Sequence, residues 1–214
     1  MDSDSISSST KQKKLFSLFK SGAAQILLGT QMIAKGLDFE NVTLVGVILA
    51  DVGLHLPDFR SAERSFGLLC QVAGRAGRGQ APGRVFIQTY NPEHYAIAAA
   101  ANQDYVDLYE REIRFRRQLG NPPFNTLAHL VFQNTNETAC QSNAPNAARM
   151  LRQKAYAQGI TSIEVVGPAP GMPSRLRGRF RWHLVLRGPD LHQFLEGASF
   201  PPGTTVDVDP VHVL

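Results

Sequence analysis

One short motif has the residue types that phosphate chemistry needs, QVAGRAGR at residues 71–78. Its two arginines, Arg75 and Arg78, stand in a glycine-rich stretch, where small residues let the backbone approach a ligand closely. Guanidinium groups are planar, permanently charged and able to bond phosphate oxygens in pairs. This pair could stabilise the charge that develops during phosphoryl transfer. A surface turn with solvated arginines is the alternative interpretation.

A second polar cluster follows a short apolar run. Residues 25–28 (QILL) predict a strand, and GTQMIAKGLD follows at residues 29–38. In open α/β sheets, ligands bind beyond the carboxyl ends of the strands. The candidate ligand-binding residues of this cluster are Gly29, Thr30, Gln31, Lys35, Gly36 and Asp38. An ordinary loop between a strand and a helix would explain the same residues.

A third polar segment, DFRSAER at residues 58–64, precedes the helix expected to carry the arginine motif. Its position ahead of that helix makes the segment a third candidate for part of the site. The alternative is a simple helix start, in which Ser61 caps the helix and the charged residues are solvated.

The segment PSRLRGRFRWH at residues 173–183 is strongly basic and contains two aromatic residues. Its candidate DNA-binding residues are Arg175, Arg177, Arg179, Arg181 and Phe180. In one extended segment, alternation would place the arginines on one face and both aromatic residues on the other. Such a face suits phosphate contact, and Phe180 suits base stacking. The alternative is a strand edge in which Trp182 belongs to the core and the arginines only add solubility.

The first half of the chain predicts an α/β layer with a parallel sheet, because strands alternate with helices. Strands are expected at residues 25–28, 42–49 and 84–89. Helices are expected at residues 11–20, 61–72 and 92–118, the last in one or two pieces. The Asn-Pro-Pro sequence at residues 121–123 ends that helix and marks a domain boundary.

The second half predicts a small α+β domain of the ferredoxin-like type, from a β-α-β, β-α-β order. Strands are expected at residues 127–132, 163–166, 181–187 and 205–208, and helices at 147–157 and 190–195. A loop rich in glycine and proline is expected at residues 167–173. The expected domains are therefore residues 1–120 and residues 121–214.

The composition fits a folded cytoplasmic protein. The chain has 214 residues, of which 43% are hydrophobic, and this allows one large domain or two small ones. A net charge of +4 and a sequence pI of about 9.3 are compatible with a nucleic-acid partner. The cysteines, Cys70 and Cys140, form no paired motif and are expected to be reduced thiols. The six histidines show no metal-binding spacing.

Taken together in this order, the three polar segments resemble the second motor lobe of superfamily 2 helicases. GTQMIAKGLDF is similar to the fifth motif of that superfamily, and QVAGRAGR to the sixth. The resemblance is stronger still to the primosomal replication-restart DNA helicase family. It extends through QTYNPEHYAI, LGNPPF, VVGPAP, RLRGRFRWHL and DVDP, and covers the chain from about residue 15 to its end.

The resemblance implies a fold and a set of residue roles. The fold would be a RecA-like second helicase lobe followed by a small α+β carboxy-terminal domain. Gln71, Arg75 and Arg78 would face the nucleotide, with Arg78 as the arginine finger. The residues of the 29–38 cluster would couple the nucleotide state to the DNA strand, and Asp38 would lie nearest the nucleotide.

The resemblance also implies an ATP-dependent 3′-5′ DNA helicase that restarts stalled forks and initiates primosome assembly. Its partners would be forked or single-stranded DNA, single-stranded DNA-binding protein and other primosome proteins. ATP and Mg²⁺ would serve the full-length protein, and zinc is expected in the family.

Several family features are missing from the sequence. It has no GxxxxGK[ST] phosphate loop, no Asp-Glu box for magnesium and no zinc-binding cysteine cluster. The first residues resemble an internal stretch of family members, so we expect a carboxy-terminal fragment that is inactive alone. Two alternatives stay open: a fragment of another superfamily 2 helicase, and a non-enzymatic DNA-binding module.

Overall fold

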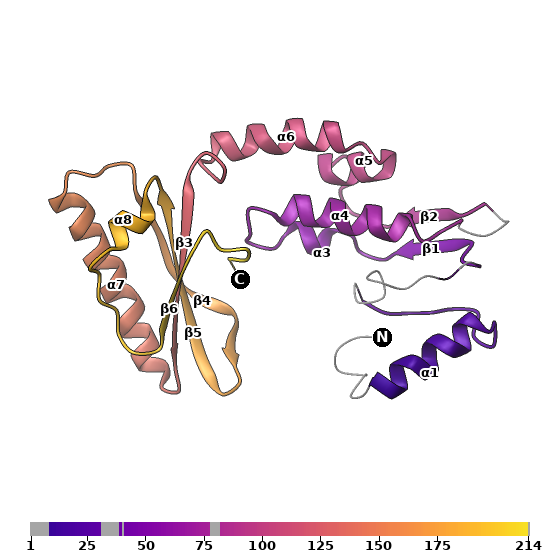
Figure 1. The fold of residues 1–214 in the computed structure, drawn as a ribbon, viewed down its shortest axis with the longest axis horizontal. Coiled ribbons are helices and arrows are strands. Elements are labelled where there is room, and N and C mark those ends of the chain that lie inside the picture. The colour runs from indigo at the N-terminus through magenta and orange to yellow at the C-terminus, as the bar shows by residue number, and fades with distance from the viewer. Residues whose placement is uncertain (1–8, 31–38, 40, 78–81, 214) are drawn as a thin grey trace. The chain divides into compact units, whose positions relative to one another are not determined.

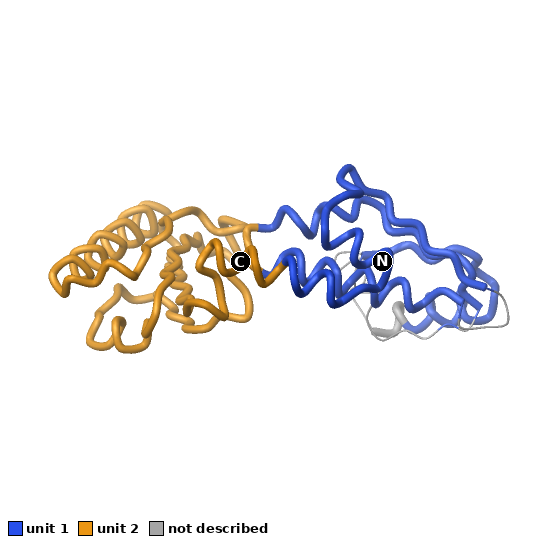
Figure 2. The backbone as a smooth tube through the Cα atoms, turned by 90° about the horizontal axis from the view of Figure 1, so that it is seen from above, with its two compact units in different colours: residues 1–56, 60–111 blue, residues 57–59, 112–214 orange. Residues whose placement is uncertain are grey.

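The computed structural model describes residues 9–30, 39, 41–77 and 82–213. The chain divides into two compact units, which Figure 2 shows in different colours. Unit 1 contains residues 1–56 and 60–111, and unit 2 contains residues 57–59 and 112–214. The division falls inside helix α6 (Tyr105–Gln118), ahead of the predicted boundary at residue 121. Leu119 and Asn121, next to the predicted boundary, both belong to unit 2. The Arg187 guanidinium of β5 donates hydrogen bonds to the Leu119 carbonyl and to the Asn121 side chain.

Unit 1 is a mixed α/β layer. Besides the first part of α6, its elements are α1 (Ser9–Lys20), β1 (Leu44–Val47), α3 (Asp51–Leu54), α4 (Ser61–Ala73), β2 (Arg84–Ile87) and α5 (Tyr95–Asn102). The strands β1 and β2 pair in parallel, as Figure 1 shows, and the sequence predicted this direction. Alternation turns Val47 and Ile87 towards a core built by α4, α5 and Leu108 of α6.

Two details of unit 1 differ from the sequence prediction, and a third settles an alternative that the prediction left open. Residues 25–28 do not form a strand, so the predicted strand ahead of the 29–38 cluster is wrong. A short helix, α3, follows β1 directly and was not predicted. The long helical stretch is two helices, one of the two predicted alternatives, because α5 ends at Asn102 and the next residue, Gln103, has a φ of 54° in the left-handed region.

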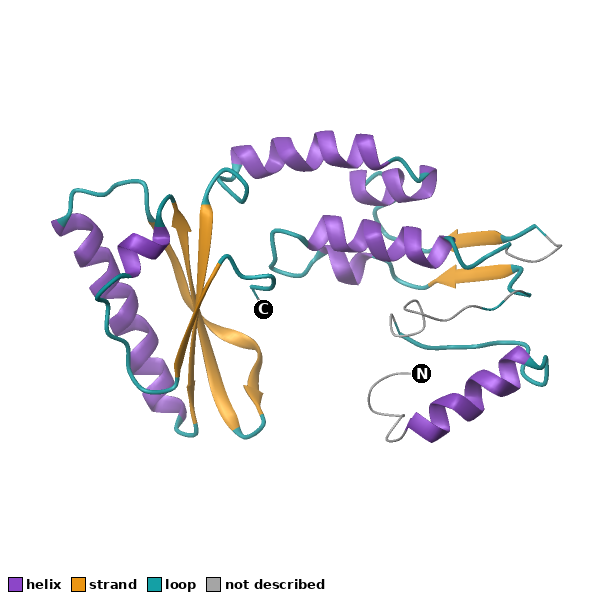
Figure 3. Cartoon of the chain, viewed as in Figure 1, coloured by secondary structure: helices purple, strands orange, loops and turns teal. Residues whose placement is uncertain are grey.

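Unit 2 contains β3 (Thr126–Asn134), α7 (Glu137–Ala157), β4 (Glu164–Leu176), β5 (Arg179–Gly188), α8 (Leu191–Leu195) and β6 (Thr204–Val208). This is the predicted β-α-β-β-α-β order. Its strands form one antiparallel sheet in the order β4-β5-β3-β6. Figures 1 and 3 show α7 and α8 on the same face of this sheet.

Two elements of unit 2 are longer than predicted. Helix α7 begins at Glu137, ten residues ahead of the expected start, and contains Pro145. Asn136 caps it by accepting a hydrogen bond from the Thr138 amide at 2.9 Å. Strand β4 continues through the predicted loop at residues 167–173, because register shifts on either side of Ala169 and Pro170 let the strand pass the prolines. The predicted loop is therefore wrong.

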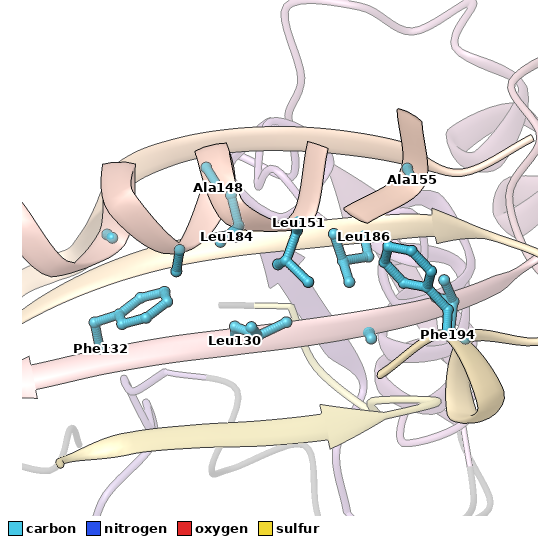
Figure 4. Packing of buried hydrophobic residues seen from close by; sticks show 12 residues of the cluster. Leu130, Phe132, Ala148, Leu151, Ala155, Leu184, Leu186 and Phe194 are labelled. Carbon is cyan, nitrogen blue, oxygen red and sulfur yellow. The ribbon is translucent and has the colours of Figure 1, made fainter. Parts of the chain in front are cut away.

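The core of unit 2 lies between the sheet and its helices (Figure 4). Alternate residues of β3 and β5, including Leu130, Phe132, Leu184 and Leu186, point to the same side and are buried. Leu151 of α7 and Phe194 of α8 pack against them. Trp182 also packs against this cluster, which confirms the core interpretation of that residue.

Two further findings concern the cysteines and the helices of the described residues. Cys70 and Cys140 are both free, as expected. Within the residues that the structure describes, none of the helices is both long and apolar enough to span a membrane.

Candidate nucleotide and DNA sites

The arginine motif continues from helix α4 into a tight turn at residues 74–77, here called the arginine turn. Amides of this turn bond back to the last turn of α4, with Arg75 N–H donating to the Val72 carbonyl at 3.0 Å. Gly77 N–H then donates to the Val42 carbonyl at 3.0 Å, and Arg84 N–H donates to the Thr43 carbonyl at 2.8 Å. The arginine turn therefore lies at the edge of the sheet where β1 and β2 begin.

Glycine is required where this turn closes. Gly77 has a φ of +77°, and a Cβ atom there would lie 2.7 Å from the Gly83 amide nitrogen. The backbone at Gly77 therefore packs closely against the backbone at Gly83 and leaves no room for a Cβ atom. The glycines of this motif suggested close approach of a ligand to the backbone. At Gly77, the structure shows that glycine allows close packing of the backbone itself.

The structure places only part of the predicted nucleotide site. Gln71 is exposed at the end of α4, and Arg75 is half-buried in the arginine turn. Gly29 and Thr30 are exposed. The remaining predicted residues lie outside the described residues, and they are Gln31, Lys35, Gly36, Asp38 and Arg78.

Phe39, Val42 and Thr43, which follow the 29–38 cluster in sequence, contact α1 or the region of the arginine turn. The Phe39 ring contacts Phe19 of α1 edge to face, with centroids 4.9 Å apart, and Phe16 at 6.1 Å. Val42, in the same segment, accepts the hydrogen bond from the arginine turn at 3.0 Å. The chain that follows Asp38 is thus held to α1 and to the arginine turn.

A polar cluster that the sequence analysis missed lies at the opposite edge of this sheet. Asp51 is buried and accepts hydrogen bonds from the Thr89 hydroxyl at 2.8 Å and from the Tyr90 amide at 3.0 Å. Burial alone would raise the pKa of Asp51, but these hydrogen bonds outweigh it and lower the pKa. The signal was available, since Asp51 closely follows one predicted parallel strand and Thr89 is the last residue of another. The bonds join the carboxyl ends of β1 and β2.

The third polar segment is divided between the two units. Asp58 belongs to unit 2, where it is buried and accepts a hydrogen bond from the Val213 amide at 3.3 Å. Helix α4 begins at Ser61, so Arg60 occupies the capping position and makes no side-chain cap. The Ser61 hydroxyl instead donates to the Leu56 carbonyl at 2.6 Å. The predicted serine cap is wrong.

The predicted DNA-binding segment is a β-hairpin that joins β4 to β5. Arg177 and Gly178 form its turn, with φ values of 49° and 79°, as two-residue hairpin turns require. Arg175, Arg177 and Arg179 are exposed around this turn. The hairpin therefore presents three guanidinium groups at one exposed tip.

The predicted arrangement of faces is wrong for Arg175. The prediction treated residues 173–183 as one extended strand, but the chain reverses at the turn. Arg175 pairs directly across from Phe180 and so shares its face, while Arg179 pairs with Leu176 on the other face. The Arg175 guanidinium stands over the half-buried Phe180 ring, 5.1 Å from its centroid. In this structure Arg175 occupies the ring face that base stacking would use.

Arg181 lies apart from the tip, on the sheet face that α7 does not cover. That face holds two histidines, His129 and His183, whose ring nitrogens Nε2 and Nδ1 are 2.9 Å apart. Burial lowers the pKa of both rings, to about 4 for His183, and the nearby Arg181 charge acts in the same direction. Scattered sequence positions concealed this pair, because only the pairing of β3 with β5 brings the rings together.

The basic stretch on α6 is largely engaged within the protein. Arg111 pairs with Asp107 at 2.8 Å, and Arg116 pairs with Glu112 at the same distance. The Arg117 guanidinium stands over the Phe124 ring, 4.8 Å from its centroid. These contacts favour a structural role over DNA contact for these three arginines.

A structural zinc site needs several sulfur, nitrogen or oxygen donors close together. Within the part of the chain that the structure describes, no group of three or more His, Cys, Asp or Glu side chains gathers closely enough to hold a metal ion. The described residues therefore do not fit the zinc site expected in the family.

Two families match the chain in succession. Residues 3–80 match the helicase conserved C-terminal domain, and residues 117–211 match the primosomal protein N C-terminal domain. The first match contains the arginine turn and the second contains the basic hairpin.

Curated relatives match across both regions. The replication restart protein PriA of Bacillus subtilis is 44% identical over 87% of this chain, and that of Treponema pallidum is 40% identical over 100%. The replication restart protein PriA of Synechocystis is 36% identical over 99% of the chain. The chain spans only 23%, 33% and 26% of the lengths of these three relatives.

Proposed function

The chain belongs to the replication restart protein PriA family, and on that basis we propose that it forms the carboxy-terminal part of an ATP-dependent 3′-5′ DNA helicase. The whole protein would restart stalled replication forks and initiate primosome assembly in the cytoplasm. The observation that carries the proposal is the order of the two family matches, a helicase C-terminal domain at 3–80 followed by the primosomal domain at 117–211.

In this proposal, unit 1 is most of a RecA-like second motor lobe, and unit 2 is a small ferredoxin-like domain. The parallel pairing of β1 with β2 supports the first assignment. The antiparallel order β4-β5-β3-β6, with both helices on one face, supports the second.

Gln71, Arg75 and Arg78 face the nucleotide in the proposed site. ATP would supply the phosphoryl group and Mg²⁺ would neutralise phosphate charge, while the Arg78 guanidinium would bond to the oxygens on which negative charge develops as that group passes from ADP to water. The hydrogen bond from Gly77 to Val42 supports a joint site for the arginine motif and the 29–38 cluster, because Val42 follows that cluster closely. Gly29, Thr30, Gln31, Lys35, Gly36 and Asp38 then couple the nucleotide to the DNA strand.

The basic hairpin supplies DNA contact in this proposal. Arg175, Arg177 and Arg179 are exposed together at its tip and suit phosphate oxygens. Phe180 takes part only if DNA draws Arg175 away from the ring beneath it. Arg181, on the other face of the sheet, is a further proposed DNA contact. Single-stranded DNA-binding protein and other primosome proteins are further proposed partners on the basis of family membership.

A second candidate is a DNA-binding module without enzymatic activity. It is favoured by the self-contained core of unit 2, which supports the exposed hairpin without help from unit 1. The sequence has no GxxxxGK[ST] phosphate loop, and both candidates therefore expect no ATP turnover from this chain by itself.

Forked DNA separates these outcomes. The full chain should bind it with a log–log salt slope of about −2 to −4, for two to four phosphate contacts. ATP turnover by the chain alone should stay well below about 1 per second. Adding the amino-terminal part of a PriA relative, which carries the phosphate loop, should restore DNA-stimulated turnover if the helicase proposal holds. Binding without restored turnover would favour the module.

A further inference from the structure

The outer face of α7 and the start of β4 enclose an open cavity that none of the sites above includes. Its volume is about 450 Å³, and it is lined by Pro145, Arg149, Arg152, Gln153, Tyr156 and Pro168. The α7 residues among these recur at helical spacing and so lie on one face. The opposite face of the same helix is the core, where Ala148, Leu151 and Ala155 are buried.

One side of the cavity is fixed by Arg152. Its guanidinium donates to the Val165 carbonyl at 3.0 Å and to the Gly167 carbonyl at 2.9 Å. These bonds hold α7 against the first part of β4, so Arg152 is both a wall of the cavity and a structural connection. The exposed Arg149 is the arginine that can move towards a ligand.

The two charged residues that line the cavity, Arg149 and Arg152, are both positive. No acidic residue occurs between Glu137 and Glu164 in the sequence, a stretch that carries Arg149, Arg152 and Lys154. Lys154 is turned aside, because its ammonium donates to the Glu196 carbonyl at 2.8 Å and stands over the Phe194 ring. The two arginines therefore set the charge of the cavity, and they favour an anionic ligand.

Tyr156 gives the cavity an aromatic surface. Its side chain is 89% exposed, although single exposed aromatic residues are common and carry no meaning alone. Here the ring lies on the same helix face as Arg149 and Gln153. A cation, an amide and an exposed ring together match the phosphate, the base edge and the base face of a nucleotide.

We propose that this cavity binds one nucleotide of single-stranded DNA. Arg149 contacts the phosphate, Tyr156 stacks on the base and Gln153 bonds to its edge. The inference rests on the proposed DNA-binding function and adds a second contact to it. Strand β4 carries both, since Pro168 lines the cavity and Arg175 belongs to the hairpin tip. About 20 Å of strand separates them, by the rise of an extended chain.

Binding of fluorescein-labelled oligothymidylate to the full chain tests this. Tyr156→Ala should weaken binding about 5- to 150-fold, the range for removing one base–aromatic contact, while Tyr156→Phe keeps the ring and the affinity. Arg149→Ala should flatten the log–log salt slope by about 0.7. Matched controls in unit 1 are Tyr90→Ala, which removes a tyrosine with 87% exposure, and Lys13→Ala, which removes one exposed positive charge.

The possible results separate this site from the function it rests on. Unchanged affinity in Tyr156→Ala, with weaker binding by a hairpin variant without Arg175, Arg177 and Arg179, overturns the cavity site but leaves DNA binding intact. No binding by the unmodified chain overturns both. An oligo-aspartate peptide that binds the chain and requires Arg149, with oligothymidylate affinity unchanged, overturns the nucleotide and assigns the cavity to an acidic peptide.

Discussion

The described sheet of unit 1 has one covered face, whereas the sheet of unit 2 has both faces occupied. In unit 1, Val47 and Ile87 face the helices, while Leu44 and Phe86 are 61% and 62% exposed on the other side. In unit 2, α7 and α8 cover one face, and the other holds the His129–His183 pair near the backbone of the last residues. Parallel sheets are normally buried on both faces, so unit 1 presents an apolar surface suited to further protein.

The same difference separates the two proposed functions. In the proposed function, the arginine turn of unit 1 would act on a nucleotide that residues outside this chain help to hold. The hairpin of unit 2 would contact DNA from a sheet that has its own core. The proposal therefore makes unit 1 dependent on other parts of the protein and lets unit 2 bind DNA by itself. Substitutions in each unit test this contrast.

The largest effect is expected for Arg78→Ala in a full-length protein that contains this chain. ATP turnover should fall by about 10³- to 10⁵-fold, because an arginine finger acts on charge that exists only during phosphoryl transfer. DNA affinity should stay close to the unmodified value. Steady-state ATPase rates with forked DNA, and anisotropy with the same DNA, measure the two quantities.

Arg78→Lys provides the matched control for charge. It should rescue turnover poorly, because an ammonium group cannot reproduce the planar fork of a guanidinium. Unmodified ATPase activity in Arg78→Ala would show that Arg75 is the finger, or that unit 1 contributes no catalytic arginine.

Core stability should differ between the units in a pair of leucine substitutions. Leu151→Ala empties a fully buried position in unit 2 and should cost about 2–5 kcal/mol of unfolding free energy. Leu44→Ala removes an exposed leucine from unit 1 and should change stability by less than about 0.5 kcal/mol. Urea unfolding measures both, and equal costs would mean that the exposed face of β1 is covered in solution.

The elements were easiest to predict where one periodicity dominated. Helix α4 and the β-α-β-β-α-β order of unit 2 are confirmed, because apolar residues repeat regularly in them. Strand β4 was cut short because its glycines and prolines indicated a loop, whereas cross-strand pairing with β5 carries the strand past them. Residues 25–28 have apolar letters but no strand partner among the described residues.

The candidate sites show a similar limit. Short sequence motifs predicted the arginine turn and the basic hairpin, because the residues of each lie close together in the sequence. The Asp51–Thr89 bond, the histidine pair and the α7 cavity each join segments far apart in the chain. Even within the hairpin, the turn at Arg177 placed Arg175 over Phe180, an arrangement that alternation along one strand could not predict.

A moderate effect of pH is expected in unit 2 because of its histidine pair. The folded pKa of His183 is about 4, below its ordinary value of 6.5, and that of His129 is also lowered. Below about pH 6.5 the two imidazole rings take up protons in the unfolded chain but stay largely unprotonated in the folded chain. The unfolding free energy should therefore fall as pH drops from about 6.5 to about 4, by at most about 3 kcal/mol for His183.

Urea unfolding at a series of pH values measures this slope. The double variant His129→Gln and His183→Gln should have a flatter profile over the same range, because neither glutamine titrates. A double variant that keeps the full slope would assign the acid sensitivity to carboxyl groups elsewhere in the chain.

The smallest effect on stability is expected at the hairpin tip, where substitutions directly test whether unit 2 binds DNA by itself. Arg175, Arg177 and Arg179 are exposed, so replacing all three with alanine should change the unfolding free energy little, as surface charges usually do. Arg177 adds a reason for a small change, because its φ of 49° is unfavourable for alanine as well as for arginine. The DNA-binding salt slope should nevertheless become shallower by up to about 2.7 on duplex DNA, one increment of about 0.9 for each phosphate that the variant no longer neutralises.

Trp182→Ala, a few residues along β5, is the opposite control. Because Trp182 packs against the core, its loss should lower the unfolding free energy by about 3–5 kcal/mol. If the triple variant keeps the full salt slope, the hairpin does not contact phosphate. Unit 2 would then have its own core but would not bind DNA through the hairpin.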